Sequence, residues 1–470
     1  MNRFVLGRRV LSVIASACLA SELAFAEGND TPSVANLKVG AAAVELRSDD
    51  ALPIAGGIGP GKATGQDGML RAVATVVQGP PNGTRVAIVA LDILMIRRDY
   101  LDAAAKEIEQ RTGIPFNNVI INCTHTHHAP STVKIHGYDV ISEFATQVKN
   151  AVVEAVVKAN EKLATSPPTT MLFVMGREAT VGQNSRMELR DGTISWGIHP
   201  GDEMRPTGPF DADFPVLAFK GTDRKLAAVL FGHSTHTIGT RTMGRRSPAF
   251  YGLAAQTFEQ ETGAVTTFIE GASGSTHLWR IDGLGFPQVW IEAERRILNA
   301  VRYHVDQAPV VPVSRIASIK REVTVTVRRF DEAVAHKAVV DYCTKHTPAP
   351  HHEKTIAIFK QMRDELAPFQ GEERKTWISA TRIGDVAIVG VPAEFFTQLG
   401  RDIKERSPFK GKTVIAELAN DYVGYVGNAD AYRLGGYQLW MGHHSWTERG
   451  TGERFVDAAI QLLNELYAQN

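Results

Sequence analysis

The five residues 124–128, with the sequence THTHH, are the segment of this chain in which reactive side chains are most concentrated. The β-branched run at 119–121 predicts a buried strand, and Pro130 predicts a loop after the motif. His125 and His127 alternate, so both side chains would point to the same side of a strand end. Imidazoles gathered there favour a metal site, because α/β enzymes bind ligands at strand ends and histidine is a common zinc ligand. A solvated histidine-rich turn has the same pattern, and the motif alone does not separate the two interpretations.

Two later strand patterns also end in residues that can bind a metal or react. Residues 229–231 lead into His233 and His236, which lie three positions apart and therefore face different sides of an extended backbone. One of the two is expected to reach a site, although a single histidine here is also typical of a loop or core residue. Residues 268–270 lead into a loop of small residues that ends at His277. Such a loop can bring backbone N–H groups close to a ligand, but an ordinary turn has the same composition.

Glu394 follows another apolar strand pattern, at the point where a helix is expected to begin. A glutamate in a first helical turn commonly interacts with the helix dipole, whereas apolar residues on both sides of Glu394 indicate a buried, paired carboxylate. The last segment of this kind, residues 420–425, ends in Tyr425, and Tyr437 follows twelve positions later. Tyrosines mostly serve as packing residues, so neither one indicates a site when taken singly.

The elements expected to position these residues alternate between strands and helices. Apolar strand patterns at 86–92 and 119–123 are each followed by an amphipathic pattern. The expected helices are 99–112, 140–163, 248–261, 287–305, 331–345, 352–366 and 453–468. Further strands are expected at 216–219, 227–231, 266–269 and 316–328, with a hairpin formed by 378–383 and 386–391. This alternation predicts an α/β fold with a mixed central sheet and flanking helices.

Charge, cysteine content and one glycine-rich loop exclude several classes of protein. The chain has 470 residues with 51 basic and 51 acidic side chains, and this balance indicates no nucleic-acid partner. The two cysteines that follow residue 26 are too few for a disulfide framework. The glycine-rich residues 56–61 precede neither a Lys-Ser/Thr pair nor a helix pattern, so a turn is expected there rather than a phosphate-binding loop.

Residues 1–26 have the features of a secretory signal peptide. They combine a basic start, an apolar stretch and a small-x-small cleavage pattern. The apolar stretch is too short to span a bilayer comfortably, and no other run is long enough for a membrane helix. We therefore expect an exported protein, periplasmic or secreted; a lipid anchor at Cys18 is less favoured because the preceding residues match a lipoprotein signal poorly. A polar lead-in is expected over 27–36 and one large domain over 37–470, with 306–313 as a candidate joint between sub-domains.

Taken together, these segments resemble the catalytic N-terminal part of the neutral/alkaline ceramidase family, over roughly residues 37 to 440. The resemblance implies four zinc ligands, which are His125, His236, Glu394 and Tyr425. His236 aligns with the family's second ligand histidine better than His233 does. The resemblance also implies active-site roles for His127 and Tyr437 and a substrate contact for Arg186. The interval between the two tyrosines matches the family and makes their pairing more specific.

The chain departs from the family pattern around the expected pocket. Ceramidases carry a serine in a GDVSP turn, but here His277 occupies the place of that serine and Ser275 the place of the aspartate. His128 replaces the serine that usually follows the THTH segment. These changes imply a substrate that differs from ceramide and is smaller or more polar. The chain ends near residue 470, so no counterpart of the immunoglobulin-like C-terminal domain of full-length ceramidases is expected.

The resemblance implies a zinc-dependent hydrolase that cleaves an amide or related acyl bond in a small-molecule or lipid-like substrate. Zinc would activate a water and polarise the carbonyl, while His127 and Tyr437 stabilise the oxyanion or move protons. His277 is a further candidate catalytic residue, and Asp92 is a candidate for orienting a ligand histidine. Two alternatives stay open: an esterase or deacetylase acting on a carbohydrate derivative, and a metal- or ligand-binding protein without catalysis. The sequence sets neither the substrate nor the oligomeric state.

Two further histidine pairs have no counterpart in this scheme. His443 and His444 follow Tyr437 closely, and a surface loop is favoured over a place in the site. His351 and His352 precede an expected helix and are expected to be solvated.

Overall fold

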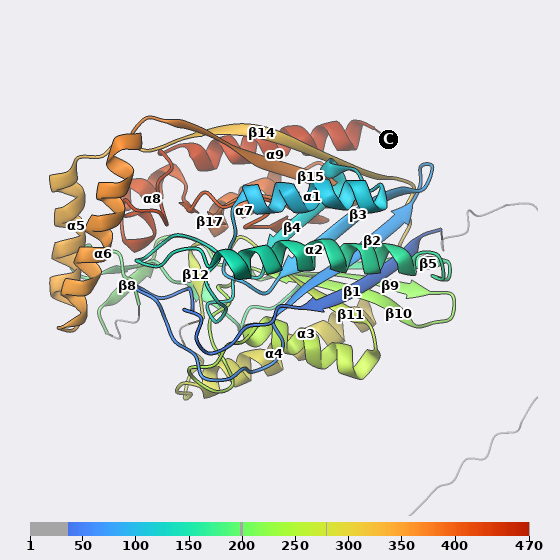
Figure 1. The fold of residues 1–470 in the computed structure, drawn as a ribbon, viewed down its shortest axis with the longest axis horizontal. Helices are drawn as coiled ribbons and strands as arrows, with labels where there is room; N and C mark the ends of the chain where they lie inside the picture. The colour runs from blue at the N-terminus through green and yellow to red at the C-terminus, as the bar shows by residue number, and fades with distance from the viewer. Residues whose placement is uncertain (1–35, 198–200, 279, 470) are drawn as a thin grey trace, which may run out of the picture. The chain divides into compact units, whose positions relative to one another are not determined.

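The structure, a computed structural model, describes residues 36–197, 201–278 and 280–469. The expected signal peptide and all but the last residue of the expected lead-in lie outside these ranges. Helices and strands alternate along the described chain, so the predicted α/β class is confirmed (Figure 1). The strands form several sheets, of which the three largest in the described part of the chain have four, five and four strands.

The first sheet has the strand order β1-β2-β3-β4. Its members are β1 (Lys38–Glu45), β2 (Arg71–Gly79), β3 (Thr84–Leu91) and β4 (Val119–Cys123). The first three pair antiparallel, whereas β4 joins β3 in parallel after a crossover through α1 (Arg98–Thr112). α2 (Ser142–Lys162) lies beside α1 on one face of this sheet (Figure 1). It packs against β1 and β2 because its stripe of alanine and valine side chains is buried there.

The second sheet has the strand order β11-β10-β9-β5-β13. Its members are β5 (Thr169–Arg177), β9 (Asp213–Gly221), β10 (Leu226–His233), β11 (Val265–Glu270) and β13 (Val310–Val311). β10 and β11 are parallel, and the other pairs are antiparallel. Helices α3 (Ala249–Thr262) and α4 (Gln288–Gln307) pack against each other and against this sheet. β13 lies within the segment 306–313 and pairs with β5.

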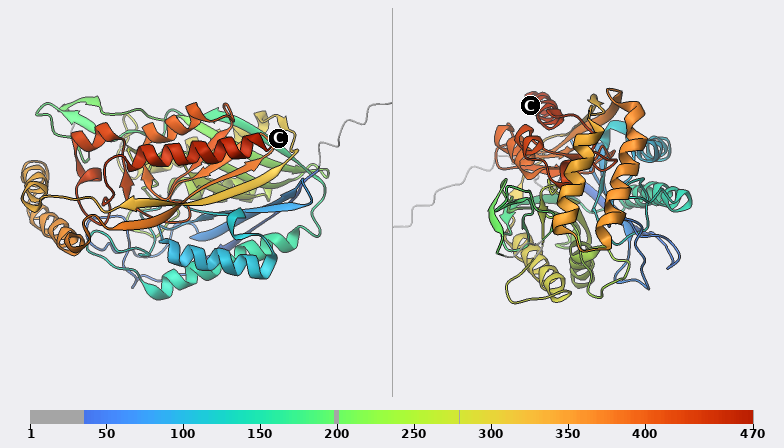
Figure 2. Two further views of the ribbon diagram at one scale, coloured as in Figure 1. Left: turned by 90° about the horizontal axis from the view of Figure 1, so that it is seen from above. Right: turned by 90° about the vertical axis from the view of Figure 1, so that its left-hand side faces the viewer.

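The third sheet has the strand order β14-β15-β16-β18. Its members are β14 (Ile316–Thr326), β15 (Glu373–Ile383), β16 (Val386–Gly390) and β18 (Thr413–Ala416). β15 and β16 form the predicted hairpin around Gly384 and Asp385, and β18 joins β16 in parallel after α7 (Thr397–Arg406). α9 (Thr451–Ala468) covers β14 and β15, while the hairpin of α5 (Glu332–His346) and α6 (His351–Leu366) stands at one end (Figure 2).

The remaining elements are short. They are β6 (Gln183–Asn184), β7 (Met187–Leu189), β8 (Glu203–Pro206), β12 (Thr276–His277), β17 (Glu394–Phe395), β19 (Tyr425–Val426), α8 (Ala429–Leu434) and the single turns Phe116–Asn118, Ala367–Phe369 and Tyr437–Leu439. They pair as β6 with β12, β7 with β8, and β17 with β19. The helices expected from periodicity are present to within a few residues at their ends, but β5 and β18 were not expected. The helix expected to begin at Glu394 begins at Thr397, and Glu394 itself lies in β17.

Apolar side chains from all three large sheets meet in one shared core. Members of this core include Val39, Ile88, Ile120, Phe173, Leu217, Phe219, Leu230, Ile316, Ile383 and Ile388, and all of them are buried. Burying one such side chain contributes about 1.5–3 kcal/mol relative to leaving it exposed. This core holds the three sheets against one another, so the ends of their strands have fixed relative positions.

Each large sheet contains one parallel pair, and the segments that follow these pairs carry the candidate site residues. Asn122, in β4, forms hydrogen bonds that connect the three sheets where β4, β11 and β18 end. The Glu270 amide donates to Asn122 Oδ1 at 3.1 Å, and the Asn122 side-chain amide donates to the Glu417 carbonyl. The Glu417 amide in turn donates to the Glu270 carbonyl at 2.9 Å.

Among the described residues, no helix has the length and apolar composition needed to cross a membrane.

Candidate metal centre

The loop that follows β4 turns sharply at His125. The backbone φ of His125 is 60°, in the left-handed region that non-glycine residues rarely adopt. After this turn the Nε2 atoms of His125 and His127 lie 3.3 Å apart. The two side chains therefore converge as predicted, but a left-handed turn beyond the strand brings them together rather than strand alternation.

Three imidazoles, those of His125, His127 and His236, share the same kind of Nδ1 contact. In each ring Nδ1 faces a backbone carbonyl oxygen, and the centroids of the three rings lie 4.5–5.7 Å apart. The carbonyls belong to Leu94, Gly56 and Ser273, at 3.1, 3.0 and 2.9 Å respectively. Because a carbonyl can only accept a hydrogen bond, Nδ1 carries a proton in all three rings. In the neutral form of each ring the lone pair is therefore on Nε2.

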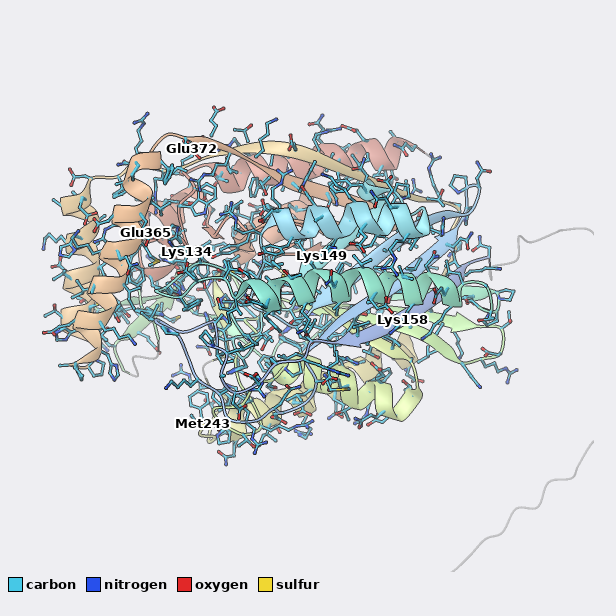
Figure 3. The ribbon with its side chains drawn as sticks, viewed as in Figure 1. Lys134, Lys149, Lys158, Met243, Glu365 and Glu372 are labelled. Carbon is cyan, nitrogen blue, oxygen red and sulfur yellow. The ribbon has the colours of Figure 1, made fainter. Side chains whose placement is uncertain are left out.

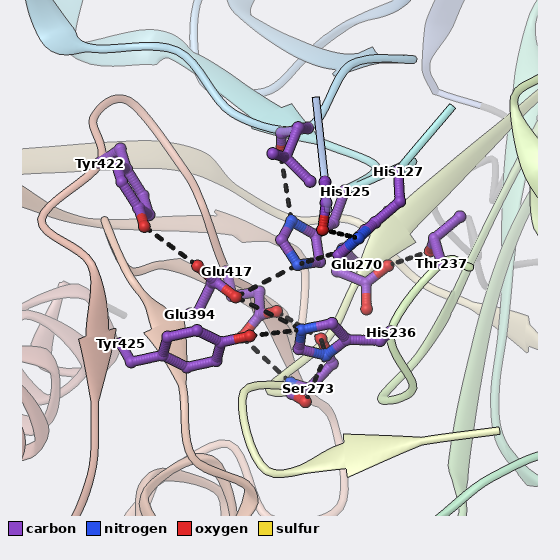
Figure 4. Close-up of polar contacts among 12 residues, drawn as sticks. His125, His127, His236, Thr237, Glu270, Ser273, Glu394, Glu417, Tyr422 and Tyr425 are labelled. Carbon is purple, nitrogen blue, oxygen red and sulfur yellow. Dashed lines mark hydrogen bonds and ion pairs between the residues drawn. The ribbon is translucent and has the colours of Figure 1, made fainter. Parts of the chain in front are cut away.

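Glu394 and Tyr425 complete the cluster from two short paired strands. β17 and β19 are parallel, with Glu394 directly opposite Tyr425. Glu394 Oε2 lies 3.3 Å from the Nε2 atoms of both His125 and His236. The Tyr425 hydroxyl lies 2.9 Å from His236 Nε2 (Figure 4). All four ligands implied by the sequence resemblance thus lie together, and His127 joins the same cluster.

This set of donors fits a bound cation. The metal-binding atoms of the three histidines lie within 4.8 Å of one another. Nε2 lone pairs that face each other at 3.3 Å, without a proton between them, repel unless a positive charge lies between them. Nitrogen and oxygen donors of this kind suit zinc and other divalent first-row metals. The three close histidines are therefore able to bind a metal ion.

Burial keeps the side chains in the forms that a metal ligand requires. The pKa of His127 lies well below 6.5, and that of His236 is also lowered, in both cases mainly because burial disfavours the imidazolium ion. Burial would raise the pKa of Glu394, but the adjacent His125 and His236 outweigh this and hold it well below 4.5. Burial and the charge of Glu394 raise the pKa of the Tyr425 hydroxyl well above 10. The cluster therefore combines an ionised Glu394 carboxylate with His127 and His236 rings that burial keeps neutral.

Two supporting residues were not found by sequence reasoning. The buried Tyr422 hydroxyl donates to Glu394 Oε1 at 3.1 Å and orients the carboxylate. Gly56 has a φ of 116°, and an added Cβ would lie 2.6 Å from the Cβ of His127. Only glycine lets this backbone carbonyl approach the His127 ring. The glycine-rich composition of 56–61 was the available signal, because glycine also marks close backbone approaches.

His277 and His128, the two departures from the ceramidase pattern, have different positions. The His277 ring stacks on the His236 ring with centroids 4.0 Å apart, so it covers one face of a candidate ligand. His128 Nε2 accepts a hydrogen bond from the Gly239 amide at 2.8 Å and thereby holds the loop that follows His236. Burial lowers the pKa of His128 to about 4.

Tyr437 packs edge-to-face against Tyr425, with the two ring centroids 6.1 Å apart. Its ring stacks on Trp196 at a centroid distance of 4.3 Å, and its hydroxyl lies 3.4 Å from Nε2 of the buried His136. His136 was not expected in the site, because a single histidine in a loop gives no sequence signal. Tyr437 thus lies close to the candidate ligands, with an imidazole beside its hydroxyl.

The preference for a surface loop at the pair 443–444 is wrong for His444. His444 is fully buried and packs against Tyr437, and its Nε2 donates to the Tyr437 carbonyl at 3.1 Å. His443 is only partly buried and lies 2.7 Å from Glu365, which also pairs with Lys134 at 3.0 Å near the surface (Figure 3). The pair therefore divides between the interior and the surface.

Arg186 supports the turn that carries Tyr437. Its guanidinium donates to Gln438 Oε1 at 2.9 Å and to the Gly435 carbonyl at 2.6 Å, and it lies 5.0 Å from the centre of the Phe396 ring. The residue is 1% exposed, and this burial lowers its pKa to about 9. Among the described residues, no carboxylate forms an ion pair with Arg186.

The expectation that Asp92 orients a ligand histidine is wrong. Asp92 accepts hydrogen bonds from the Arg71 amide at 2.9 Å and from the Thr124 hydroxyl at 3.3 Å. The carbonyl of Leu94, two residues further along the chain, lies against His125 instead. A backbone acceptor of this kind has no side-chain signature, so the sequence could not reveal it.

His233 faces away from the cluster, as expected for a residue three positions from His236. Its Nδ1 lies 2.5 Å from the Tyr251 hydroxyl and its Nε2 lies 2.9 Å from the Glu178 carbonyl. Both ring nitrogens are therefore engaged outside the cluster.

Comparison with known proteins identifies the fold. No protein-family model and no curated protein matches the chain. Among solved structures, neutral ceramidase from Pseudomonas aeruginosa matches with a TM-score of 0.70 and 18% identity, over 92% of this chain and 75% of that chain. A ceramidase complexed with C2 matches with a TM-score of 0.68 and 18% identity, over 92% and 76% of the two chains. The chain therefore has the fold of neutral ceramidases, as the sequence resemblance implied.

Proposed function

We propose that this protein is a zinc-dependent hydrolase that cleaves an amide or related acyl bond with water. The observation that carries the proposal is the convergence of three Nε2 lone pairs and one carboxylate oxygen in the interior of a ceramidase fold. His125, His236, Glu394 and Tyr425 would hold the ion, with His127 at its side. When bound, the zinc ion supplies a Lewis acid that polarises the acyl carbonyl and lowers the pKa of water.

His127 and Tyr437 handle protons in this proposal. The His127 ring is neutral and its Nδ1–H is engaged by the Gly56 carbonyl, so Nε2 is the nitrogen that would accept a proton during the reaction. It is the half-buried member of the three histidines, whereas His125 and His236 are fully buried. The Tyr437 hydroxyl is protonated, because burial and Glu394 raise its pKa well above 10, and it can donate to a developing oxyanion.

Arg186 and His277 shape the site around these groups. Arg186 holds the turn of Tyr437 in place through Gln438 and Gly435. His277 covers one face of His236 and occupies the place that a serine has in ceramidases. We therefore propose a small-molecule or lipid-like acyl substrate that differs from ceramide.

The experiment that tests this function combines metal analysis with a substrate panel. The purified protein is analysed for zinc and then assayed with a fluorescent ceramide and with simple amides and esters. The proposal predicts bound zinc and hydrolysis of at least one amide or ester, with loss of hydrolysis after chelation and recovery on adding zinc. Bound zinc without any turnover would favour a binding protein instead. Turnover that survives removal of the metal would contradict the proposed mechanism.

We further propose that the protein is exported. The support is the basic, apolar and small-residue pattern of residues 1–26. Expression of the full chain in a bacterium with two membranes, followed by N-terminal sequencing of the periplasmic and secreted fractions, tests this. The predicted mature protein starts at Glu27, and an intact N-terminus confined to the cytoplasm would contradict it.

A further inference from the structure

Glu417 is a buried carboxylate that has no place in the chemistry described so far. It follows β18 and is fully buried. Its Oε2 accepts hydrogen bonds from the Ser273 amide at 3.0 Å and from the Phe395 amide at 2.7 Å. Its Oε1 accepts from the Ser273 hydroxyl at 2.5 Å (Figure 4). One side chain thus contacts two segments, one after β11 of the second large sheet and one after β16 of the third.

Each of these two segments fixes the position of a candidate metal ligand. The Ser273 carbonyl accepts from His236 Nδ1 at 2.9 Å, so the position of Ser273 sets the orientation of the His236 ring. Phe395 directly follows Glu394, so the bond to its amide fixes the backbone from which the Glu394 side chain extends. A Cβ on Gly274 would overlap the Glu394 carbonyl, which shows how closely the two loops approach.

We infer that Glu417 is a positioning residue that fixes His236 and Glu394 relative to each other through the backbones of Ser273 and Phe395. This inference rests on the proposed metal centre and goes beyond it, because it assigns a role to a residue that does not touch the ligands' own side chains. A carboxylate suits this role because one oxygen accepts hydrogen bonds from two backbone amides at once, while the other accepts a hydrogen bond from the Ser273 hydroxyl.

Glu270 is the acidic neighbour of Glu417. The two residues are joined by a backbone hydrogen bond of 2.9 Å, and Glu270 Oε2 accepts from the Thr237 hydroxyl at 2.7 Å. Burial raises the pKa of both carboxyl groups, and the charge of Glu417 further raises that of Glu270. Three hydrogen-bond donors point at Glu417, which favours the negative charge on Glu417 and a proton on Glu270. The role of Glu417 therefore depends mainly on its accepting oxygens.

Four variants separate this role from ordinary core packing. Glu417→Ala removes all three accepted hydrogen bonds. Glu417→Gln keeps a side-chain oxygen that can accept from both backbone amides, while its NH₂ group can donate to the Ser273 hydroxyl oxygen. Ser273→Ala removes only the hydroxyl and keeps the carbonyl that faces His236. Leu462→Ala, which truncates a fully buried residue of α9, is a control for general loss of stability.

Three measurements are made on each full-length variant: zinc affinity by competition with a chelator, the visible absorption spectrum of the cobalt-substituted protein, and the melting temperature. We expect Glu417→Ala to bind zinc about 10- to 100-fold more weakly than the wild type and to have a changed cobalt spectrum. Glu417→Gln should stay within about threefold of the wild type on the same scale, with the native spectrum. Ser273→Ala should weaken zinc binding less than Glu417→Ala does, because it removes only one of the hydrogen bonds to Glu417, together with a hydroxyl 3.4 Å from His236 Nδ1. Leu462→Ala should lower the melting temperature without changing either metal property.

Each contrary outcome has its own meaning. Wild-type zinc affinity and cobalt spectrum in Glu417→Ala would overturn the inference and leave the proposed function standing. Equal loss of affinity in Glu417→Ala and Leu462→Ala would also overturn it, because the effect would then reflect stability alone. A wild-type protein that binds zinc but hydrolyses nothing would refute the hydrolase while the affinities still decide the role of Glu417. A wild type that binds no zinc would overturn both.

Discussion

Glu394 lies directly opposite Tyr425 in the parallel pairing of β17 with β19. The pairing places a carboxylate and a phenol on the same side of His236, with Glu394 Oε2 at 3.3 Å and the Tyr425 hydroxyl at 2.9 Å from its Nε2. Two strands of two residues each thus bring together groups that are far apart in the chain. Glu394 and Tyr425 come from segments that follow β16 and β18 of the third large sheet, while the histidines come from segments that follow strands of the first two sheets.

Replacing a candidate ligand histidine with alanine should remove the metal. His125→Ala and His236→Ala each delete one nitrogen donor, and a centre with fewer ligands binds zinc more weakly. We expect zinc affinity to fall by more than the roughly 10- to 100-fold that loss of an outer-shell partner costs, and hydrolysis to fall with it. His233→Ala is the matched control, because this histidine is also buried but both of its ring nitrogens are engaged elsewhere. Zinc analysis of the purified variants checks the prediction, and equal zinc content in all three would refute it.

Tyr422→Phe should weaken metal binding without unfolding the protein. The substitution removes the hydroxyl that donates to Glu394 Oε1 at 3.1 Å and leaves the carboxylate free to rotate. Loss of such a supporting hydrogen bond typically lowers metal affinity about 10-fold. Tyr432→Phe serves as the control, because its hydroxyl donates to the Thr447 carbonyl at 3.2 Å, away from the cluster. If chelator competition gave the same zinc affinity for both variants, the support assigned to Tyr422 would be wrong.

Gly56→Ala should disturb both the backbone and the site. At a φ of 116° an alanine is strained, and its Cβ would lie 2.6 Å from that of His127. Gly192→Ala is the matched control, because its φ of 78° is also positive but no atom lies within 4 Å of the added Cβ. We expect the control to lose about 1–2 kcal/mol of stability and to keep its zinc affinity. Gly56→Ala should lose zinc affinity as well, and unchanged affinity there would contradict the close packing of Gly56 on His127.

Protonation of His128 should destabilise the fold as the pH falls. The folded protein lowers the pKa of His128 from 6.5 to about 4 through burial, so folding favours the neutral ring. The stabilisation is fully present above pH 6.5 and is lost as the pH falls through about 4, to a limit of roughly 3 kcal/mol. In His128→Gln an amide oxygen can accept from the Gly239 amide without titrating, so its stability should fall less with acid. Denaturant unfolding between pH 4 and 7, with a chelator present, measures the difference, and parallel pH profiles would refute the prediction.

Local patterns predicted most of the secondary structure. Amphipathic periodicity located α1, α2 and α9 to within a few residues, and the Gly384–Asp385 turn located the β15–β16 hairpin. β5 was not expected, and the helix expected from Glu394 begins three residues later, at Thr397. Strand ends with polar residues were also located correctly, because an apolar run that stops at histidine or glutamate is a local signal.

The sequence could not reveal how the site is supported. Leu94 and Ser273 act through backbone carbonyls, which every residue possesses. Tyr422 reaches Glu394, and Glu417 reaches Ser273 and the Phe395 amide, only because three sheets pack around one core, and that arrangement depends on contacts between distant segments. His127 was assigned a catalytic role, but its position relative to His125 depends on a left-handed turn that no residue type predicts.

The measurement that tests the metal centre most directly is X-ray absorption at the zinc edge of the purified wild-type protein. The account predicts about one zinc per chain, coordinated only by nitrogen and oxygen at about 2.0–2.2 Å, with the outer-shell scattering of imidazole rings. The imidazole signal should decrease in His236→Ala. A protein that holds no zinc after growth in zinc-supplemented medium, or zinc with sulfur in its coordination shell, would contradict the account.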